Sequence, residues 1–146
     1  MGTWYVIAGR FTPLEKGAHN AIEIYTYLPD LEQIDIDFKF NRGSLDGAPV
    51  SIAQKGWVYN KENRSHWKIS PFWPLKLDYL VLAVAGDYSW TAIGVPNQSY
   101  LWIMARTPHL SQESMKEVLK ALAARDYSAD GMITVQHNEV PTRTGK

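Results

Sequence analysis

The chain has 146 residues, with 15 basic and 15 acidic side chains and a net charge of zero. This length fits one domain with a sizeable core, and the balanced charge provides no long-range field to favour nucleic acid or an anionic membrane as a partner. There is no cysteine, which excludes disulfides, a thiolate nucleophile and a thiolate metal site. The sequence also has no run of about 18 apolar residues that would span a membrane as a helix.

Aromatic residues make up 12% of the chain, including six Trp and eight Tyr. Aliphatic side chains can fill a core of this size, so the aromatic content favours an apolar binding surface. A core that is rich in tryptophan but completely filled is the alternative.

Residues 2–10 read as a β-strand, in which successive side chains point to opposite faces. Trp4, Val6 and Ala8 are then expected on one face, with Tyr5 and Ile7 on the other. A large ring followed by smaller side chains is typical of a barrel interior that is closed at one end and open further along.

Two further strands follow, over residues 21–28 and around residues 34–40. The second alternates clearly: Ile34, Ile36, Phe38 and Phe40 occupy one face, while polar residues occupy the other. The first is ambiguous. Its periodicity alone would bury Ile22 and Ile24, leaving Glu23, Tyr25 and Tyr27 outside.

The remaining strands are expected over residues 51–59, 65–70, 78–85, 88–95 and 100–106, separated by polar, Gly-containing or Pro-containing turns. Gly56 is expected to mark a bend or bulge, and Trp67 and Ile69 should share one face. Two prolines interrupt residues 71–77, so this segment is expected to be a loop. Its Phe72 and Trp73 are expected either at the rim of a cavity mouth or packed on the side of the barrel.

A helix is predicted over residues 111–125, with Ser111 as its N-cap. Met115, Val118, Leu119 and Leu122 recur at helical spacing and should face the sheet. Residues 132–136 are expected to form a short strand beside the first, and residues 140–146 a polar tail.

Eight strands joined by short hairpins predict an all-β fold, an eight-stranded up-and-down antiparallel barrel with one C-terminal α-helix on its side. We expect residues 1–146 to form a single domain, with the barrel over about 2–107. Closure of the barrel removes the exposed edges of an open sheet.

Three short motifs give this pattern a resemblance to a known family. Gly2-x-Trp4 resembles the first signature of the lipocalins, Asp87-Tyr88 resembles the second with Gly86 in place of Thr, and Arg106 matches the third. The motifs occur in order, and the resemblance covers nearly all of residues 2–137. It is closest to the bacterial lipocalins and apolipoprotein D.

The resemblance implies that Arg106 stacks on the Trp4 ring and seals one end of the barrel, in a cation–π arrangement. It also places Tyr25 inside the barrel, and Glu23 with it. Gly2, Trp4, Asp87 and Arg106 would then be the residues that close the barrel.

The expected function is to bind a small hydrophobic ligand, a fatty acid or lysophospholipid, in the barrel for transport or storage. Burial of each CH₂ group of an acyl chain contributes about 0.8 kcal/mol. The candidate ligand-binding residues are Glu23, Tyr25, Tyr27, Ile36, Phe38, Trp67, Ile69, Leu80 and Trp102.

The sequence offers few motifs that are typical of enzymes. The sequence has no Gly-x-Ser-x-Gly motif, no His-Glu-x-x-His motif and no phosphate-binding loop. His19, His66, His109 and His137 lie far apart and lack metal-site spacing, so neither a metal nor a cofactor is expected. Two alternatives remain: a cavity enzyme of isomerase or hydrolase type with Glu23 as general base, and a filled barrel that binds a partner through Phe72 and Trp73.

Resemblance to the bacterial lipocalins implies a periplasmic protein or one associated with the outer membrane. Because the chain starts at its first strand, we expect that a leader or lipid anchor has been removed, which would allow proximity to the membrane. The expected partner is a small hydrophobic molecule, and the chain is expected to be a monomer or homodimer.

Overall fold

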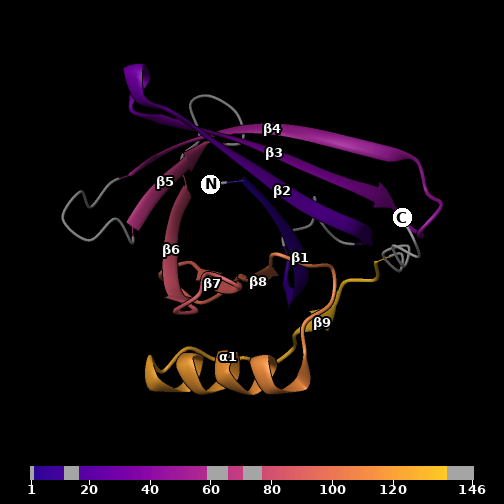
Figure 1. The fold of residues 1–146 in the computed structure, drawn as a ribbon, viewed down its shortest axis with the longest axis vertical. Coiled ribbons are helices and arrows are strands. Elements are labelled where there is room, and N and C mark those ends of the chain that lie inside the picture. Colours follow the sequence, from indigo (N-terminus) through magenta and orange to yellow (C-terminus); the bar gives the residue numbers. More distant parts are fainter. Residues whose placement is uncertain (1, 12–16, 59–65, 71–76, 138–146) are drawn as a thin grey trace.

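The structure is a computed structural model that describes residues 2–11, 17–58, 66–70 and 77–137. Strands and helices follow one another along the chain as drawn in Figure 1. They are β1 (Gly2–Arg10), β2 (Ala18–Leu28), the short 3-10 helix η1 (Pro29–Leu31), β3 (Gln33–Arg42), β4 (Pro49–Val58), β5 (His66–Ser70), β6 (Leu77–Val84), β7 (Trp90–Gly94), β8 (Leu101–Ala105), α1 (Gln112–Ala124) and β9 (Ile133–Thr134). Phe72, Trp73 and the expected tail lie outside the described residues.

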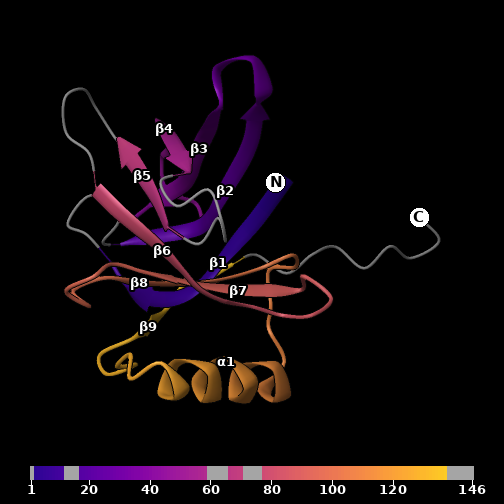
Figure 2. The ribbon, with the colours of Figure 1, turned by 90° about the vertical axis from the view of Figure 1, so that its left-hand side faces the viewer.

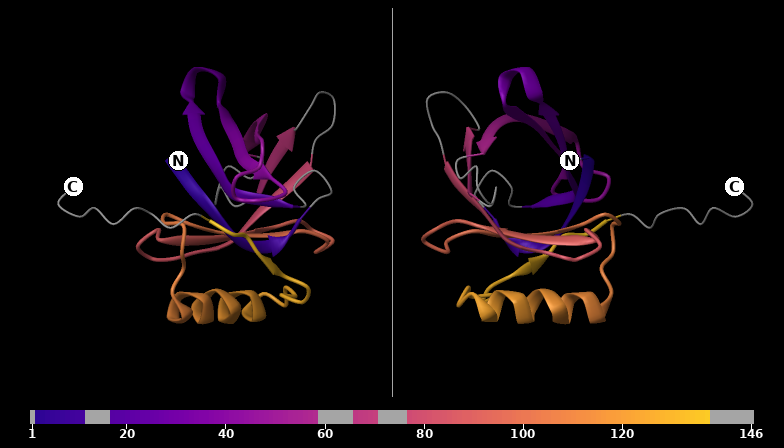
Figure 3. Two further views of the ribbon diagram at one scale, coloured as in Figure 1. Left: turned by 90° about the vertical axis from the view of Figure 1, so that its right-hand side faces the viewer. Right: turned by 60° about the vertical axis from the view of Figure 1, so that its left-hand side comes forward.

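Strands β1 to β8 form the closed antiparallel barrel that the sequence predicts. Each strand pairs with its neighbour in the chain, and β1 closes the ring by pairing with both β2 and β8. The right-hand view of Figure 3 looks into this ring. Since the chain moves only between adjacent strands, short connections are sufficient throughout the barrel.

The barrel has two apolar clusters, one on each side of its wall. The interior cluster includes Trp4, Tyr25, Ile36, Phe38 and Met104. The other cluster lies between the wall and α1, which runs below β7 and β8 in Figure 2. This second cluster explains why several strands are apolar on their outer faces as well.

Strand β3 shows the predicted alternation most clearly. Ile34, Ile36, Phe38 and Phe40 are all buried in the interior cluster, and Asp37 and Lys39 between them are exposed. This contrast between the two faces is what a wall with one apolar side and one wet side requires.

A bulge in β1 changes the faces predicted for that strand. Val6 pairs with Met104 of β8, and the next pair is Ala8 with Ile103, so Ile7 is an extra residue on the β1 side. As a result, Ala8 joins Ile7 in the helix-side cluster. The prediction that Ala8 shares the inner face of Trp4 and Val6 is therefore wrong.

Gly56 is not a bulge, because β4 pairs with both β3 and β5 without a register shift there. A Cβ atom at this position would lie 2.6 Å from Cδ1 of Ile69. The glycine therefore makes room for Ile69, which is buried in the interior cluster.

The helix α1 begins as predicted. The Ser111 side chain accepts a hydrogen bond of 3.1 Å from the Ser114 amide, and Val118 and Leu122 are buried against the barrel. Leu119 keeps 39% of its surface exposed, so its expected contact with the sheet is wrong. Within the described residues, no helix is long and apolar enough to cross a bilayer.

The segment after α1 returns to the barrel, where β9 pairs with Ala8 and Gly9 of β1 as predicted. The Val135 amide donates to the Ile7 carbonyl at 2.8 Å, and the Asn20 amide donates to the Gln136 carbonyl at 2.7 Å. Val135 is itself buried in the interior cluster. This segment therefore bridges β1 and β2 where their direct pairing, which ends at Tyr5, has stopped.

Candidate functional site: the barrel interior

At one end of the barrel, Arg106 covers Trp4. The Arg106 guanidinium carbon lies 3.7 Å from the centroid of the Trp4 ring, and Nη1 donates a 2.9 Å hydrogen bond to the Thr3 carbonyl. Gly2 has a φ of +83°, and a Cβ atom there would lie 3.3 Å from Arg106 Nη1. The expected stacking is confirmed, and Gly2 leaves space for the guanidinium.

Asp87 organises the turn between β6 and β7 near the same end. Its Oδ1 accepts a 3.0 Å hydrogen bond from the Ser89 amide, and hydrogen bonds from the Ser89 side chain and backbone lower the pKa of the Asp87 carboxyl. The Arg106 amide donates to the Ser89 carbonyl at 3.1 Å. Ser89 therefore connects the Asp87 turn to the backbone of Arg106.

The predicted apolar wall is largely present. Ile36, Phe38 and Ile69 are buried in the interior cluster, and Trp67 and Trp102 pack against it. Both tryptophans face inward, yet each is only partly buried. Each of these two tryptophans therefore keeps part of its surface accessible.

A polar cluster lies within this apolar wall. Glu23 is 8% exposed and Tyr25 is 5% exposed, and the Tyr25 hydroxyl donates to Glu23 Oε1 at 3.3 Å. The same hydroxyl makes a short contact with the Tyr79 hydroxyl. Burial, followed by the negative charge of Glu23, raises the pKa of Tyr25 well above its usual value, so this hydroxyl keeps its proton.

The inward orientation of Glu23 and Tyr25 follows the family resemblance rather than the periodicity of the strand. Ile22 and Ile24, which periodicity alone would bury, are only partly buried. Tyr27 lies further along β2 and keeps 40% of its surface exposed. It is absent from the interior cluster, so its predicted contact with a ligand is not supported by its position.

The prediction that Leu80 faces the cavity is wrong. Leu80 pairs with the outward-facing His66 and packs in the helix-side cluster. Its neighbour Tyr79 pairs with Trp67 and occupies the inner position instead. Sequence reasoning missed Tyr79 because residues 77–84 are apolar on both faces and give no alternation to count.

Aromatic rings form a continuous row along this part of the wall. The Trp67 and Tyr79 ring centroids are 5.5 Å apart with planes at 20°, and those of Tyr79 and Trp102 are 6.1 Å apart with planes at 22°. Such offset pairs stabilise the packing beyond the area that they bury. The row places the Tyr79 hydroxyl next to Tyr25.

Comparison with known proteins agrees with this geometry. The family model described as the lipocalin-like domain matches residues 1–137. The chain belongs to the lipocalin-like family. The outer membrane lipoprotein Blc of Escherichia coli K12 is 28% identical over 138 residues, covering 93% of this chain and 76% of the relative. Temperature-induced lipocalin-1 of Arabidopsis thaliana is 28% identical over 152 residues, covering 97% and 78%.

Solved structures show the same fold. Lobster apocrustacyanin A1 superposes with a TM-score of 0.75 at 16% sequence identity, covering 94% of this chain and 77% of that one. Lipocalins bind small hydrophobic ligands and are generally binding proteins rather than enzymes. The interior of this lipocalin-like barrel is therefore the candidate binding site.

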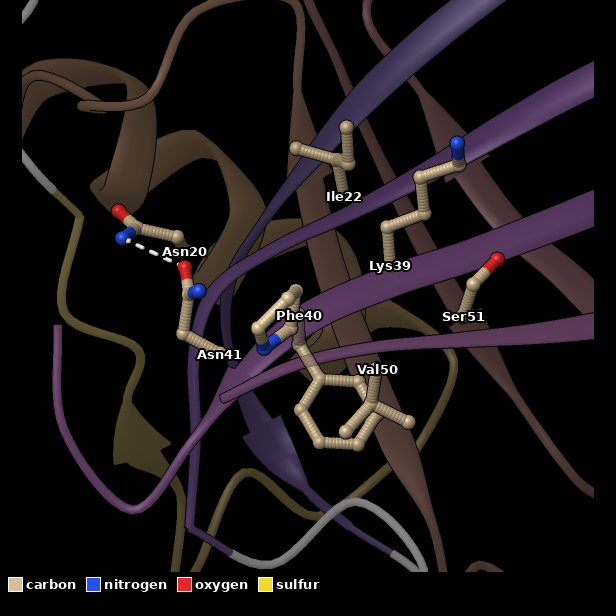
Figure 4. Close-up of a pocket in the computed structure, with 8 residues that line it drawn as sticks. Asn20, Ile22, Lys39, Phe40, Asn41, Val50 and Ser51 are labelled. Carbon is tan, nitrogen blue, oxygen red and sulfur yellow. Dashed lines mark hydrogen bonds between the residues drawn. The ribbon is translucent and has the colours of Figure 1, made fainter. Parts of the chain in front are cut away.

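A hollow of about 350 Å³ lies at the ends of β2, β3 and β4 (Figure 4). Its lining residues are Asn20, Ile22, Lys39, Phe40, Asn41, Pro49, Val50 and Ser51. The Asn20 side chain donates to Asn41 Oδ1 at 3.0 Å across one end. None of the predicted ligand-binding residues lines this hollow. A smaller void of about 10 Å³ lies between Val6, Phe11, Ala18, Ala21, Phe38 and Val135.

The histidines of this lipocalin-like chain do not converge. His66 Nε2 lies 2.8 Å from Asp78 Oδ1 on the outer face, where Lys68 also contacts that carboxylate. His19 Nδ1 lies 2.9 Å from the Gly17 carbonyl. Among the residues that the structure describes, no group of three acidic or histidine side chains is arranged to hold a metal ion.

Proposed function

We propose that the barrel holds one small hydrophobic ligand, a fatty acid or a lysophospholipid, for transport or storage. The supporting observation is the inner wall: Ile36, Phe38 and Ile69 make it apolar, while Trp67 and Trp102 pack against this cluster and are only partly buried. Burial of an acyl chain against such a wall contributes about 0.8 kcal/mol per CH₂ group. A long chain therefore binds without a specific contact to its head group.

Titration with a fluorescent fatty acid tests this proposal, because Trp67 and Trp102 lie on the proposed binding surface. We expect quenching of tryptophan emission that saturates at one ligand per chain. Trp102→Phe should remove part of the quenching while leaving the stoichiometry unchanged. A titration that leaves tryptophan emission unchanged would show that the barrel is filled, as the interaction-module alternative requires.

A cavity enzyme is the second candidate, and the burial of Glu23 beside the Tyr25 hydroxyl favours it. A carboxylate in such a position can act as a general base. This alternative requires turnover that disappears in Glu23→Gln while ligand binding persists. Binding without any turnover of the ligand favours transport or storage.

We further propose that the protein works in the bacterial envelope, associated with the outer membrane. The support comes from relatives described as outer membrane lipoproteins in Escherichia coli and Citrobacter freundii. Fractionation of cells that express the gene at its natural level tests this location. Recovery in the membrane or periplasmic fraction supports it, and recovery in the cytosol alone contradicts it.

A further inference from the structure

The row of aromatic rings on the inner wall extends to a fourth ring, that of Tyr100. The ring centroids of Tyr100 and Trp102 are 6.1 Å apart with planes at 39°, and Trp102 is in turn stacked with Tyr79. Leu101, which lies between Tyr100 and Trp102 in the chain, packs in the helix-side cluster instead. Tyr100 and Trp102 therefore share the inner face of the wall. The candidate residues predicted from the sequence include Trp102 but not Tyr100.

Tyr100 lies at the end of the barrel opposite to the end that Arg106 covers. Strand β1 begins beside Trp4, on which Arg106 stacks, and ends at Arg10. Arg10 pairs with Leu101 at the start of β8, and Tyr100 directly precedes that residue. A ring of strands has two ends at which a ligand can enter, and Arg106 covers one of them. We call the other end, where Tyr100 lies, the mouth of the barrel.

Arg10 holds the turn between β7 and β8 from the neighbouring strand β1. Its Nη2 donates a 2.8 Å hydrogen bond to the Gln98 carbonyl. Its Nη1 donates to the Ser128 carbonyl at 2.6 Å and to the Asp130 carbonyl at 2.9 Å. One guanidinium thus joins this turn to the loop that follows α1 (Figure 2). The rigid planar arrangement of its donors is a property of arginine that lysine lacks.

Tyr127, in the loop that follows α1, holds the same turn at two further points. Its hydroxyl donates to the Tyr100 carbonyl at 2.5 Å and accepts from the Val95 amide at 3.0 Å. The Arg10 guanidinium carbon lies 5.8 Å from the centroid of the Tyr127 ring. We call Arg10 and Tyr127 the mouth clamp. The clamp fixes the backbone of Tyr100 and of Gln98, and so the point from which the Tyr100 ring projects.

We propose that Tyr100 contacts the ligand at the mouth of the barrel, and that Arg10 is a positioning residue that holds the Tyr100 ring beside Trp102. This inference rests on the proposed function and refines it by adding a contact residue and the residue that orients it. An aromatic ring at the mouth offers a large, rigid apolar surface to the part of an acyl chain that lies there. Arg10 acts through the turn, because its donors are engaged by three backbone carbonyls.

Isothermal titration calorimetry with dodecanoate, below the concentration at which it forms micelles, measures the Kd of the full chain and of its variants. We expect Tyr100→Ala to weaken binding by about three-fold to ten-fold. Tyr100→Phe keeps the ring and should bind as the wild type does. Arg10→Ala should weaken binding by a similar or smaller factor, because it loosens the turn but leaves the Tyr100 ring in the chain.

A double-mutant cycle separates positioning from a general loss of stability. Because Arg10 acts through Tyr100, Arg10→Ala should change Kd by less than about two-fold once residue 100 is alanine. Arg10→Lys keeps the charge but not the planar set of donors, so it should also weaken binding, and it replaces Arg10→Ala if that variant does not fold. Leu122→Ala is the matched control, since it removes packing from the helix-side cluster and should leave Kd unchanged.

The outcomes separate this inference from the proposed function. An unchanged Kd in Tyr100→Ala overturns the inference and leaves a lipid-binding barrel in place. A loss of affinity in Arg10→Ala that persists in full beside Tyr100→Ala also overturns it, as does an equal loss in Leu122→Ala. Failure of dodecanoate to bind the wild type overturns the proposed function itself, and the inference with it.

Discussion

Arg106 combines two interactions at the covered end of the barrel, its stacking on Trp4 and its hydrogen bond to the Thr3 carbonyl. A partly desolvated cation–π pair contributes roughly 1–2 kcal/mol. We therefore expect Arg106→Ala to lower the free energy of unfolding by about 2 kcal/mol, measured by urea denaturation. Arg42→Ala is the control, because its guanidinium carbon lies 5.7 Å from the Phe40 ring and the residue is exposed. Equal losses in the two variants would contradict the sealing role of Arg106.

Gly94 is required by the space that Tyr127 occupies. The Tyr127 hydroxyl donates to the Tyr100 carbonyl at 2.5 Å and accepts from the Val95 amide at 3.0 Å. A Cβ atom on residue 94 would lie 2.4 Å from that hydroxyl. We expect Gly94→Ala to reduce stability by about 1–3 kcal/mol.

Gly86→Ala is the matched control for Gly94→Ala, because nothing lies within 4 Å of a Cβ atom at residue 86. We expect no loss of stability in this control, and a gain of a few tenths of a kcal/mol from the less flexible unfolded chain. Thermal unfolding of both variants measures the difference. A Gly94→Ala variant that is as stable as Gly86→Ala would show that Tyr127 can move away from the added methyl group without a loss of stability.

Individual residues also show where sequence reasoning succeeds and fails. Trp4, Arg106 and Asp87 could be assigned because each belongs to a short motif with a defined place in the family. Glu23 and Tyr25 could be placed inside only through that resemblance, since the isoleucines beside them give the stronger periodic signal. Tyr79 gave no signal, because its strand is covered on both faces.

At the scale of elements, α1 buries one narrow stripe against the barrel. Leu122 is 1% exposed and Leu119 is 39% exposed, on the same helix. We expect Leu122→Ala to lower the free energy of unfolding by about 2–5 kcal/mol, as truncation of a buried leucine does. Leu119→Ala should change it by less than about 0.5 kcal/mol, as most surface substitutions do. Similar losses in a denaturation series would show that both faces of α1 are packed.

The segment around β9 is expected to respond to pH through His137. Its Nε2 donates to the Val6 carbonyl at 2.7 Å, and burial lowers the pKa of His137 below its usual value of 6.5. The folded state therefore binds this proton less readily than the unfolded state, so the contribution to stability is complete above pH 6.5. It is lost as the pH falls from that value through the lowered pKa.

Hydrogen exchange of the Val135 amide, which donates to Ile7, measures this effect. We expect its protection factor, corrected for intrinsic exchange, to fall between about pH 7 and pH 5. His137→Gln should make the profile flatter. The same pH dependence in the wild type and in His137→Gln would assign the effect to another group.

Strand positions were easier to predict than strand faces, and the bulges explain the difference. A bulge at Ile7 moves Ala8 to the helix side, and another lies between Val81 and Ala83 in β6. Each inserts one residue on one strand only, which shifts all later side chains of that strand to the opposite face. The apolar sequences of these two strands contain no pattern that indicates where the extra residue lies.

At the scale of the whole molecule, β1 closes the barrel around one interior space. Pairing of β1 with both β2 and β8 makes the ring, and Arg106 covers its Trp4 end. The apolar wall and the polar cluster of Glu23, Tyr25 and Tyr79 lie inside the ring. Because side chains from all eight barrel strands belong to the interior cluster or pack against it, no single element can form the site by itself.

We propose above that this ring encloses one hydrophobic ligand. Native mass spectrometry of the freshly purified chain, before and after addition of one equivalent of lipid, tests it most directly. We predict a single adduct with the mass of one lipid, and its loss when the barrel is unfolded. A bare chain that takes up no lipid, or binds several lipids without saturation, would contradict it.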